Sequence, residues 1–457
     1  MSASLRSAQA AERPKSVEAS LPPGPRLPRA LQAVLRAWHY EEFRKRCCSR
    51  YGDTFTLRIG GLPTSVITSD RDAIKRLFTG DPLQKRHGND SLRPLVGSQS
   101  ILVLEPEAHL ERRKMLLPPF HGERVAAYAR LIEQLTVARL GQLEAGETVS
   151  MQKIAQALTL DVILRAVLGI SDPALRERLS RTYDSLSRPH NVFLLLLVPV
   201  LGRRSRWNLA SRSAWRLKDE LDALLLAQIT ATRADSRLAE RDDVLAMMIL
   251  ARDEHGEGLS DEELRDDLIT LITAGHETTA TAIAWGVELL VHNPEVLADA
   301  RPDDDAYMEA LVKEVLRMYP PVPVGGAREV LAPFELGRYT IPPRVPILVD
   351  AYGVHHDPAV YPEPDVFRPE RFLDGQPESY AFLPFGGGAH RCLGATLATL
   401  EARVVLREIL KRVELTATSP QLAQAIARGP TIAPRGGARV RVAPRRAPHV
   451  EQSLAIS

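Results

Sequence analysis

A single cysteine, Cys392, stands in a glycine-rich stretch (residues 385–395) directly before a predicted helix. A helix N-terminus and a nearby metal ion both favour the ionised thiol, so this residue could supply a soft, anionic metal ligand. The glycines at 386–388 can adopt positive φ and lie against a large planar group. The alternatives are a buried structural cysteine and a phosphate-binding loop. A phosphate loop usually has a Lys with Ser or Thr, or the spaced glycines of a dinucleotide fold, and this stretch has neither.

A second candidate stretch lies within a long predicted helix. Ser260 opens a capping-box pattern and no proline follows until Pro294, which predicts a helix of about 30 residues and roughly 50 Å. Residues 274–278 in its middle read Ala-Gly-His-Glu-Thr, and a mid-helix glycine followed by threonine lowers helix stability. Such a departure within a strong helix often marks function. The alternative for Thr278 is a plain hydrogen bond to the carbonyl of Ala274, one turn earlier.

The elements that must position these residues can be placed from their patterns. Apolar residues at helical spacing predict helices over 33–51, 149–169 and 392–412. Residues 54–59 and 64–68 alternate around a glycine pair, which predicts a β-hairpin. Residues 336–350 read as short strands with turns, and residues 80–104 read as a long irregular loop, a kind of segment that is often functional.

Composition restricts the class of protein. The 457 residues include 59 basic and 57 acidic side chains, and the net charge of +2 argues against a nucleic-acid binder. Three cysteines, two of them adjacent, cannot build a disulfide framework, so we expect a reducing cytoplasm. Residues 1–21 contain no apolar run typical of a signal peptide or membrane anchor. We expect a disordered tail over 1–21, one domain over 22–445, a C-terminal tail over 446–457, and a monomer.

The full string Phe-x-x-Gly-x-His-x-Cys-x-Gly at residues 385–394 resembles the haem-binding loop of the cytochrome P450 superfamily. The resemblance implies a fold that is mainly α with a smaller β part, and haem b between the long central helix and the cysteine helix. It implies that Cys392 is the proximal iron ligand, whose thiolate favours O–O cleavage. It also implies that the central helix supplies Glu277 to relay protons and Thr278 to hydrogen-bond dioxygen, and that this helix deforms above the haem.

The resemblance extends to residues that would hold the haem. His109 and Arg113 lie four apart on the helix opened by Pro106 and match a His-x-x-x-Arg motif whose members bond a haem propionate. Arg328 and His390 match two further propionate donors. The residues expected to contact the haem are therefore Cys392, His109, Arg113, Arg328, His390, Phe385, Gly386 and Ala274. His276 is expected to face away from it.

A structural network is also implied. Glu314 and Arg317 form a Glu-x-x-Arg pair, and Arg371 lies 21 residues before Cys392, matching the third member of the family's Glu-Arg-Arg network. We expect these three residues to fix the cysteine loop and to have no chemical role.

The apolar run over 192–201 is too short, and broken by Pro199, to span a bilayer. The basic residues that follow it would suit a shallow membrane contact. A buried cap over the active site is favoured because the family has its mobile lid here. In the family the loop over 80–104 and two later segments also line the pocket, so substrate contacts are expected from Leu95, Val96, Ile101, Val322, Val324, Ala327 and residues 430–432.

The implied activity is insertion of one oxygen atom from O2 into an apolar small molecule such as a fatty acid, terpenoid, steroid or polyketide. The chain shows no flavin or iron–sulfur module, so electrons would come from a separate ferredoxin or flavodoxin with its reductase. A peroxide-driven haem-thiolate peroxygenase and a non-catalytic haem sensor are the alternatives. Seven basic residues near the proximal side are expected either to be solvated or to dock an acidic carrier: Arg112, Arg113, Lys114, Arg403, Arg407, Lys411 and Arg412.

Overall fold

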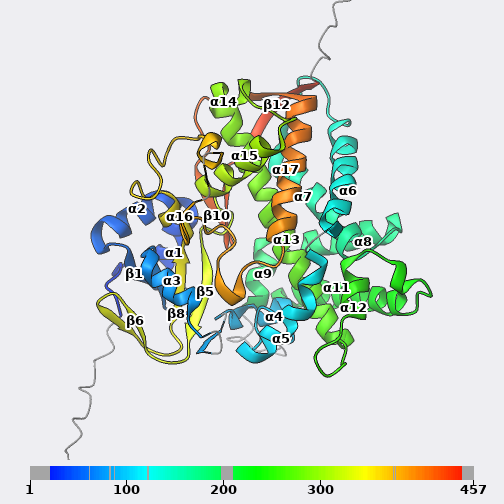
Figure 1. The fold of residues 1–457 in the computed structure, drawn as a ribbon, viewed down its shortest axis with the longest axis horizontal. Helices are drawn as coiled ribbons and strands as arrows, with labels where there is room; N and C mark the ends of the chain where they lie inside the picture. Colours follow the sequence, from blue (N-terminus) through cyan, green and yellow to red (C-terminus); the bar gives the residue numbers. More distant parts are fainter. Residues whose placement is uncertain are drawn as a thin grey trace, which may run out of the picture.

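The structure is a computed structural model that describes residues 21–444 apart from 61, 82–83, 87, 121–122, 197–208, 374 and 376. Helices make up most of it; the blue and yellow strands lie at the left, and the red C-terminal strand lies at the top (Figure 1). The fold is mainly α with a smaller β part, as expected. The helices are α1 (Arg29–Trp38), α2 (Tyr40–Tyr51), α3 (Arg71–Thr79), α4 (Arg93–Val96), α5 (Pro106–Leu116), α6 (Glu123–Leu140), α7 (Met151–Val162), α8 (Pro173–Leu186), α9 (Pro189–Leu196), α11 (Leu209–Arg233), α12 (Val244–Leu250), α13 (Asp261–His292), α14 (Pro294–Ala298), α15 (Asp305–Met318), α16 (Ala351–His355) and α17 (Ala395–Arg412).

The largest sheet of the described chain has the strand order β1-β2-β8-β5-β3, in which only the β2–β8 pair is parallel. The predicted hairpin is confirmed as β1 and β2, with Thr54 opposite Thr68. The strands are β1 (Thr54–Leu57), β2 (Ser65–Thr68), β3 (Lys85–Arg86), β4 (Thr148–Ser150), β5 (Val324–Val330), β6 (Phe334–Leu336), β7 (Tyr339–Ile341), β8 (Pro346–Asp350), β9 (Val413–Ala417), β10 (Ala425–Arg428), β11 (Thr431–Pro434) and β12 (Arg439–Pro444).

The long central helix is confirmed as α13. The Ser260 side chain accepts from the Glu263 backbone N–H and the Glu263 carboxylate accepts from that of Ser260, so the capping box closes the first turn. The helix lies in the middle of the molecule beside α7 and α17 (Figure 1). Trp285 is fully buried, stacks on Tyr319 at 3.6 Å, and donates to the Ile432 carbonyl at 2.9 Å. This bond fixes the β10–β11 hairpin against α13.

Two expected elements differ from the prediction. The helix expected over 33–51 is two helices, α1 and α2, because His39 has a non-helical backbone (φ −136°, ψ 51°) and its carbonyl starts the second helix. The loop expected over 80–104 contains β3, a 3₁₀ turn and α4.

The last part of that loop is tied to α13. The carboxylate of Asp266 accepts from the Gln99 N–H at 2.9 Å and that of Asp267 accepts from the Ile101 N–H at 2.8 Å. A Cβ at Gly97 would lie 2.1 Å from the Asp266 carboxylate, so this approach requires glycine. Three residues expected to touch substrate are buried in the main core, and their contact with substrate stays a prediction: Leu95, Val96 and Ile101.

Some predictions fall outside the described residues. These are the tails at 1–20 and 445–457, residues 197–201 of the apolar run, and the basic residues after it at 203–207. The first part of the run forms the end of α9. Among the described residues, no helix combines the length and apolar character needed to cross a bilayer.

Candidate active site

The cysteine loop is closed by its own backbone. The Cys392 N–H donates to the Phe385 carbonyl at 3.0 Å, and the Gly386 N–H donates to the Leu383 carbonyl at 3.1 Å. The helix expected to start at Cys392 begins three residues later, at Ala395, because Gly394 provides the non-helical cap. Cys392 therefore lies just before the N-terminus of α17, where the helix dipole favours an anion.

Two of the three loop glycines are needed for close packing on α3. A Cβ at Gly388 (φ +64°) would lie 2.3 Å from the Phe78 carbonyl oxygen, and one at Gly387 would lie 2.5 Å from the Phe78 ring. Gly386 also has positive φ (+65°), but its Cβ would meet no atom within 4 Å. The loop is thus pinned by Phe78 on one side, and Gly386 faces open space.

The thiol of Cys392 is accessible, although protein surrounds it on most sides. This burial raises the pKa of Cys392, while the Gly394 N–H and the guanidiniums of Arg113 and Arg391 lower it. No group of three or more His, Cys, Asp and Glu side chains in the described chain is arranged to hold a metal ion. A single thiol is too few ligands for a metal bound by protein side chains alone. It suits an iron ion whose other ligands come from a macrocycle.

Four basic side chains come together beside this loop. The rings of His109, from α5, and His390 stack at 4.1 Å with an angle of 9° between them. Arg328 from β5 is 2% exposed and donates to the Gly387 carbonyl at 2.9 Å. Arg113 interacts electrostatically with Arg328 and with both rings. Four residues expected to face the haem propionates are thus neighbours, although they come from three separate segments.

The electrostatics of this cluster suit an anionic group. Burial and the charges of Arg113 and Arg328 lower the pKa of His109 to about 4. Burial and neighbouring cations lower the pKa of His390 to about 2, and burial with Arg113 lowers the pKa of Arg328 to about 10. Arg328 donates to carbonyl oxygens and to no carboxylate of the described chain. With His109 and His390 neutral near pH 7, the positive charge lies on Arg113 and Arg328, which repel each other, and a pair of carboxylates such as haem propionates would stabilise both.

The middle of α13 offers a small, partly exposed patch. Ala274 is exposed, and Gly275, Glu277 and Thr278 are half-buried. The Thr278 hydroxyl donates to the Ala274 carbonyl at 2.6 Å, which is the alternative weighed from the sequence. The helix is α-helical without a break here, so the expected deformation is not observed. A π-helical turn occurs instead after α7, over Ile163–Val167, where a Cβ at Gly275 would lie 3.2 Å from Ile163.

Glu277 is held by two residues that the sequence did not reveal. Its Oε2 accepts from Nε2 of Gln156, on α7, at 2.5 Å, and its Oε1 lies 3.6 Å from Nη1 of Arg428 at the end of β10. The Glu277 side chain is 24% exposed and that of Arg428 is 41% exposed, so the carboxylate connects to solvent. Both partners lie far from Glu277 in the sequence. The one signal in the sequence was that Arg428 lies next to residues 430–432, which were expected to line the pocket.

His276 faces away from this patch, as expected. Its Nδ1 is 2.9 Å from the Thr159 hydroxyl, and the Tyr183 ring packs against it edge-on at 5.6 Å. Burial lowers the pKa of His276 to about 4, so it is neutral near pH 7. It therefore belongs to the packing of α13 against α7 and α8.

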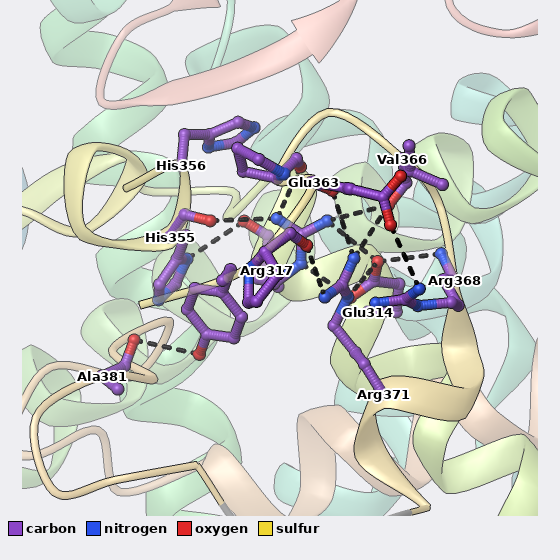
Figure 2. Close-up of polar contacts among 12 residues, drawn as sticks. Glu314, Arg317, His355, His356, Glu363, Val366, Arg368, Arg371 and Ala381 are labelled. Atoms are coloured by element: carbon purple, nitrogen blue, oxygen red, sulfur yellow. Dashed lines mark hydrogen bonds and ion pairs between the residues drawn. The ribbon is translucent and has the colours of Figure 1, made fainter. Parts of the chain in front are cut away.

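The expected Glu-Arg-Arg contacts are present (Figure 2). Arg317 donates to both carboxylate oxygens of Glu314 at 2.7 and 2.8 Å, and Arg371 donates to Oε1 at 3.0 Å. Glu314 and Arg317 are fully buried. Breaking such a pair leaves an uncompensated buried charge, which costs about 3–5 kcal/mol.

His355, which sequence reasoning missed, links this network to the cysteine loop. Its Nε2 accepts from the Leu383 N–H at 2.8 Å, so its Nδ1 carries the proton and donates to the Arg317 carbonyl at 3.1 Å. Burial lowers the pKa of His355 well below its ordinary value, consistent with this neutral tautomer. Leu383 is two residues before Phe385, so the network reaches the loop through one imidazole.

Of the seven basic residues expected to be solvated or to dock an acidic carrier, Arg112 departs from both expectations, and docking by the others stays a prediction. Arg112 is buried and bonded to Asp267 at 2.7 Å and to Glu263. Three others pair with acidic residues distant in the sequence, Lys114 with Glu254, Arg407 with Asp305 and Lys411 with Asp303, and Arg412 pairs with Glu408 one turn earlier on the same helix.

Comparisons with known proteins agree with this geometry. A family model described as Cytochrome P450 matches residues 21–429. "Putative cytochrome P450 135B1" of Mycobacterium tuberculosis (strain ATCC 25618 / H37Rv) is 40% identical over 439 residues, 92% of this chain and 91% of that protein. "Putative cytochrome P450 137" of the same strain is 37% identical over 442 residues, 93% of this chain and 92% of that protein.

The structure titled "Retinoic acid bound cyanobacterial CYP120A1" shares the fold, with a TM-score of 0.79 and 24% identity over 93% of this chain and 100% of that chain. With the cysteine loop and its surrounding cations, these matches show that the chain belongs to the cytochrome P450 family.

Proposed function

We propose that the protein is a haem-thiolate monooxygenase that inserts one oxygen atom from O2 into an apolar small molecule, by hydroxylation or epoxidation. The observation that carries the proposal is the exposed Cys392 beside a cluster of four basic side chains, just before α17, the helix that packs on α13 with its Glu277 and Thr278. Membership of the family supports a monooxygenase in general.

The residues of the chain fit haem b. Cys392 would ligate the iron, Phe385, Gly386 and Ala274 would line the porphyrin, and four side chains would bond the propionates: His109, Arg113, Arg328 and His390. When bound, the haem supplies the binding and activation of O2. The protein supplies the ligand, the charge balance and the orientation of the substrate.

Proton supply is assigned to Glu277 and Thr278. The Glu277 carboxylate can take a proton from the solvent side, where Arg428 lies, while the bond from Gln156 holds it in place. The Thr278 hydroxyl donates to the Ala274 carbonyl, so it must turn from that oxygen before it can donate into the site. Glu277 and Thr278 together would move protons from solvent to the reacting oxygen.

The substrate and the electron donor are proposed by class. We assign an apolar compound such as a fatty acid, terpenoid, steroid or polyketide, and a ferredoxin or flavodoxin with its reductase as donor, in the cytoplasm. Val324 and Ala327, on the same strand as Arg328, are half-buried and available to line the pocket.

The test has two steps. A panel of apolar compounds is first screened for the spin-state shift of the Soret band, and hits are then incubated with ferredoxin, reductase and ¹⁸O-labelled O2. We expect one labelled oxygen atom in the product. Product formed with hydrogen peroxide and none with the reductase system would favour a peroxygenase, whereas spectral shifts without any product would favour a sensor.

A further inference from the structure

Helix α1 differs from an ordinary surface helix because it buries a polar side chain and exposes large apolar ones. Gln32 is 1% exposed, and its side chain donates to the carbonyls of Pro25 and Leu27 and accepts from the Arg58 N–H. Leu35 packs against a small core cluster, but the other large apolar residues of the helix are exposed. An amphipathic helix normally buries its apolar face against the body of the protein, so the exposed face needs another partner.

The exposed apolar residues form one stripe. Leu31, Val34 and Trp38 are 41%, 52% and 55% exposed, and Leu27, one turn before Leu31, is 40% exposed. Their spacings of three and four residues place them on one face of the helix. Leu62, 46% exposed, follows on the β1–β2 loop, where the Gly60 N–H bonds the Arg29 carbonyl. We call Leu27, Leu31, Val34, Trp38 and Leu62 the apolar stripe.

Cations border the apolar stripe. A groove of about 1170 Å³ shares Leu27 with the stripe, and its lining includes the guanidinium-bearing residues Arg26, Arg46, Arg50 and Arg58. Within the described residues none of these four takes part in an ion pair, and Glu42, the acidic residue in the lining, is paired with His39. At the C-terminal end of the stripe, the guanidinium of Arg435 lies 5.8 Å from the centre of the Trp38 ring.

We propose that the apolar stripe and these arginines form a docking surface for a membrane that contains anionic lipids. A helix with leucine, valine and tryptophan on one side, bordered by arginines, is typical of a segment that lies in the lipid headgroup region. Unpaired arginines complement lipid phosphates, whereas a second copy of this chain would bring the same positive charge against itself. The contact is peripheral and places one face of the enzyme on a lipid surface, where apolar compounds collect.

The test is flotation of the full-length, haem-loaded protein with vesicles of phosphatidylcholine alone or mixed with phosphatidylglycerol. We expect binding to the mixed vesicles, weakening as sodium chloride is raised. The double variant Val34→Ser/Trp38→Ser should reduce the partition coefficient by about tenfold. The double variant Arg46→Glu/Arg50→Glu should reduce it by at least about fivefold for each arginine.

Matched controls distinguish binding through this surface from non-specific effects of exposed apolar area and net charge. Leu250→Ser/Val366→Ser removes two apolar side chains elsewhere that are 44% and 46% exposed, and Arg130→Glu/Lys153→Glu makes the same change in net charge on other helices. Both controls should bind as the wild type does, and all variants should keep the wild-type haem spectrum.

Three results would overturn the proposal: no binding to mixed vesicles, equal loss in the controls, or equal binding to neutral vesicles. A gel-filtration dimer broken by Val34→Ser/Trp38→Ser, without vesicle binding, would show that a second copy covers the stripe. Loss of vesicle binding on replacing Arg6, Arg13 and Lys15 by serine, with no effect of Arg46→Glu/Arg50→Glu, would assign membrane binding to the N-terminal segment instead.

Discussion

Glu401 on α17 is a buried carboxylic acid without an opposing charge. It is 3% exposed, its Oε1 has no hydrogen-bond partner in the described chain, and burial raises its pKa to about 8 from an ordinary 4.5. In the unfolded chain this carboxyl ionises near pH 4.5, whereas in the native protein it keeps its proton until about pH 8. The native state therefore binds one more proton within this window, and stability falls as the pH rises through it.

Glu401→Gln should remove this loss. pH 7 is about 2.5 units above the pKa of Glu401 in the unfolded chain. At about 1.4 kcal/mol per unit, the variant should be more stable than the wild type by about 3 kcal/mol at this pH. At pH 5 the gain should be under about 1 kcal/mol. For a chain of this size 3 kcal/mol corresponds to a Tm increase of about 3 °C. The assay is thermal unfolding of the holoprotein at pH 5, 6, 7 and 8.

Glu408→Gln is the matched control. Glu408 lies on the same helix and is 4% exposed, but it is paired with Arg412 at 2.7 Å, so its loss should not stabilise the protein. A Glu401→Gln variant no more stable than the wild type at pH 7, or a gain that does not change with pH, would refute the reasoning.

Three further substitutions test the site. Gly388→Ala should lower haem content strongly because its Cβ would overlap the Phe78 carbonyl, whereas Gly337→Ala in the β6–β7 turn, with similar φ (+60°) and no atom within 4 Å, should cost only about 1–2 kcal/mol and keep the haem. Gln156→Leu should slow turnover and increase the solvent isotope effect, while the substrate-induced spectral shift stays unchanged. Arg317→Met should reduce the free energy of unfolding by about 3–5 kcal/mol because a buried carboxylate loses its partner.

Each of these has a result that would contradict it. Equal haem content in Gly337→Ala and Gly388→Ala would mean that contact with Phe78 does not position the loop. Unchanged turnover in Gln156→Leu would remove Gln156 from proton supply. If Glu277→Gln is also unchanged, the proposed relay itself fails. Arg317→Met stability within 1 kcal/mol of the wild type would mean that water reaches this network.

Local signals in the sequence predicted much of the fold and the centre of the site. The capping box at Ser260 predicted the start of α13, and the lack of proline before Pro294 predicted its length, because helix ends depend on residues close in the sequence. The cysteine loop was found for the same reason: its glycines, His390 and Cys392 are close in sequence and in space.

Contacts between distant segments could be predicted only where the family resemblance implied them, as for Glu314 and Arg371. Gln156 and His355 have roles only because α7 and α16 bring them to Glu277 and Leu383, and nothing in their own neighbourhoods signals this. Arg112 was misjudged for the same reason, since Asp267 lies 155 residues away. The exposed apolar stripe of α1 was also missed. Apolar periodicity identifies the apolar face of a helix, but it does not tell whether that face is turned to the core or to solvent.

The most direct test of the central claim is the absorption spectrum of the reduced, carbon-monoxide-treated protein. If Cys392 ligates haem iron, the Soret band should lie at the position typical of a thiolate-ligated haem, and Cys392→Ala should abolish that band. A Soret band typical of imidazole ligation in the wild type, or a spectrum that Cys392→Ala leaves unchanged, would contradict the account.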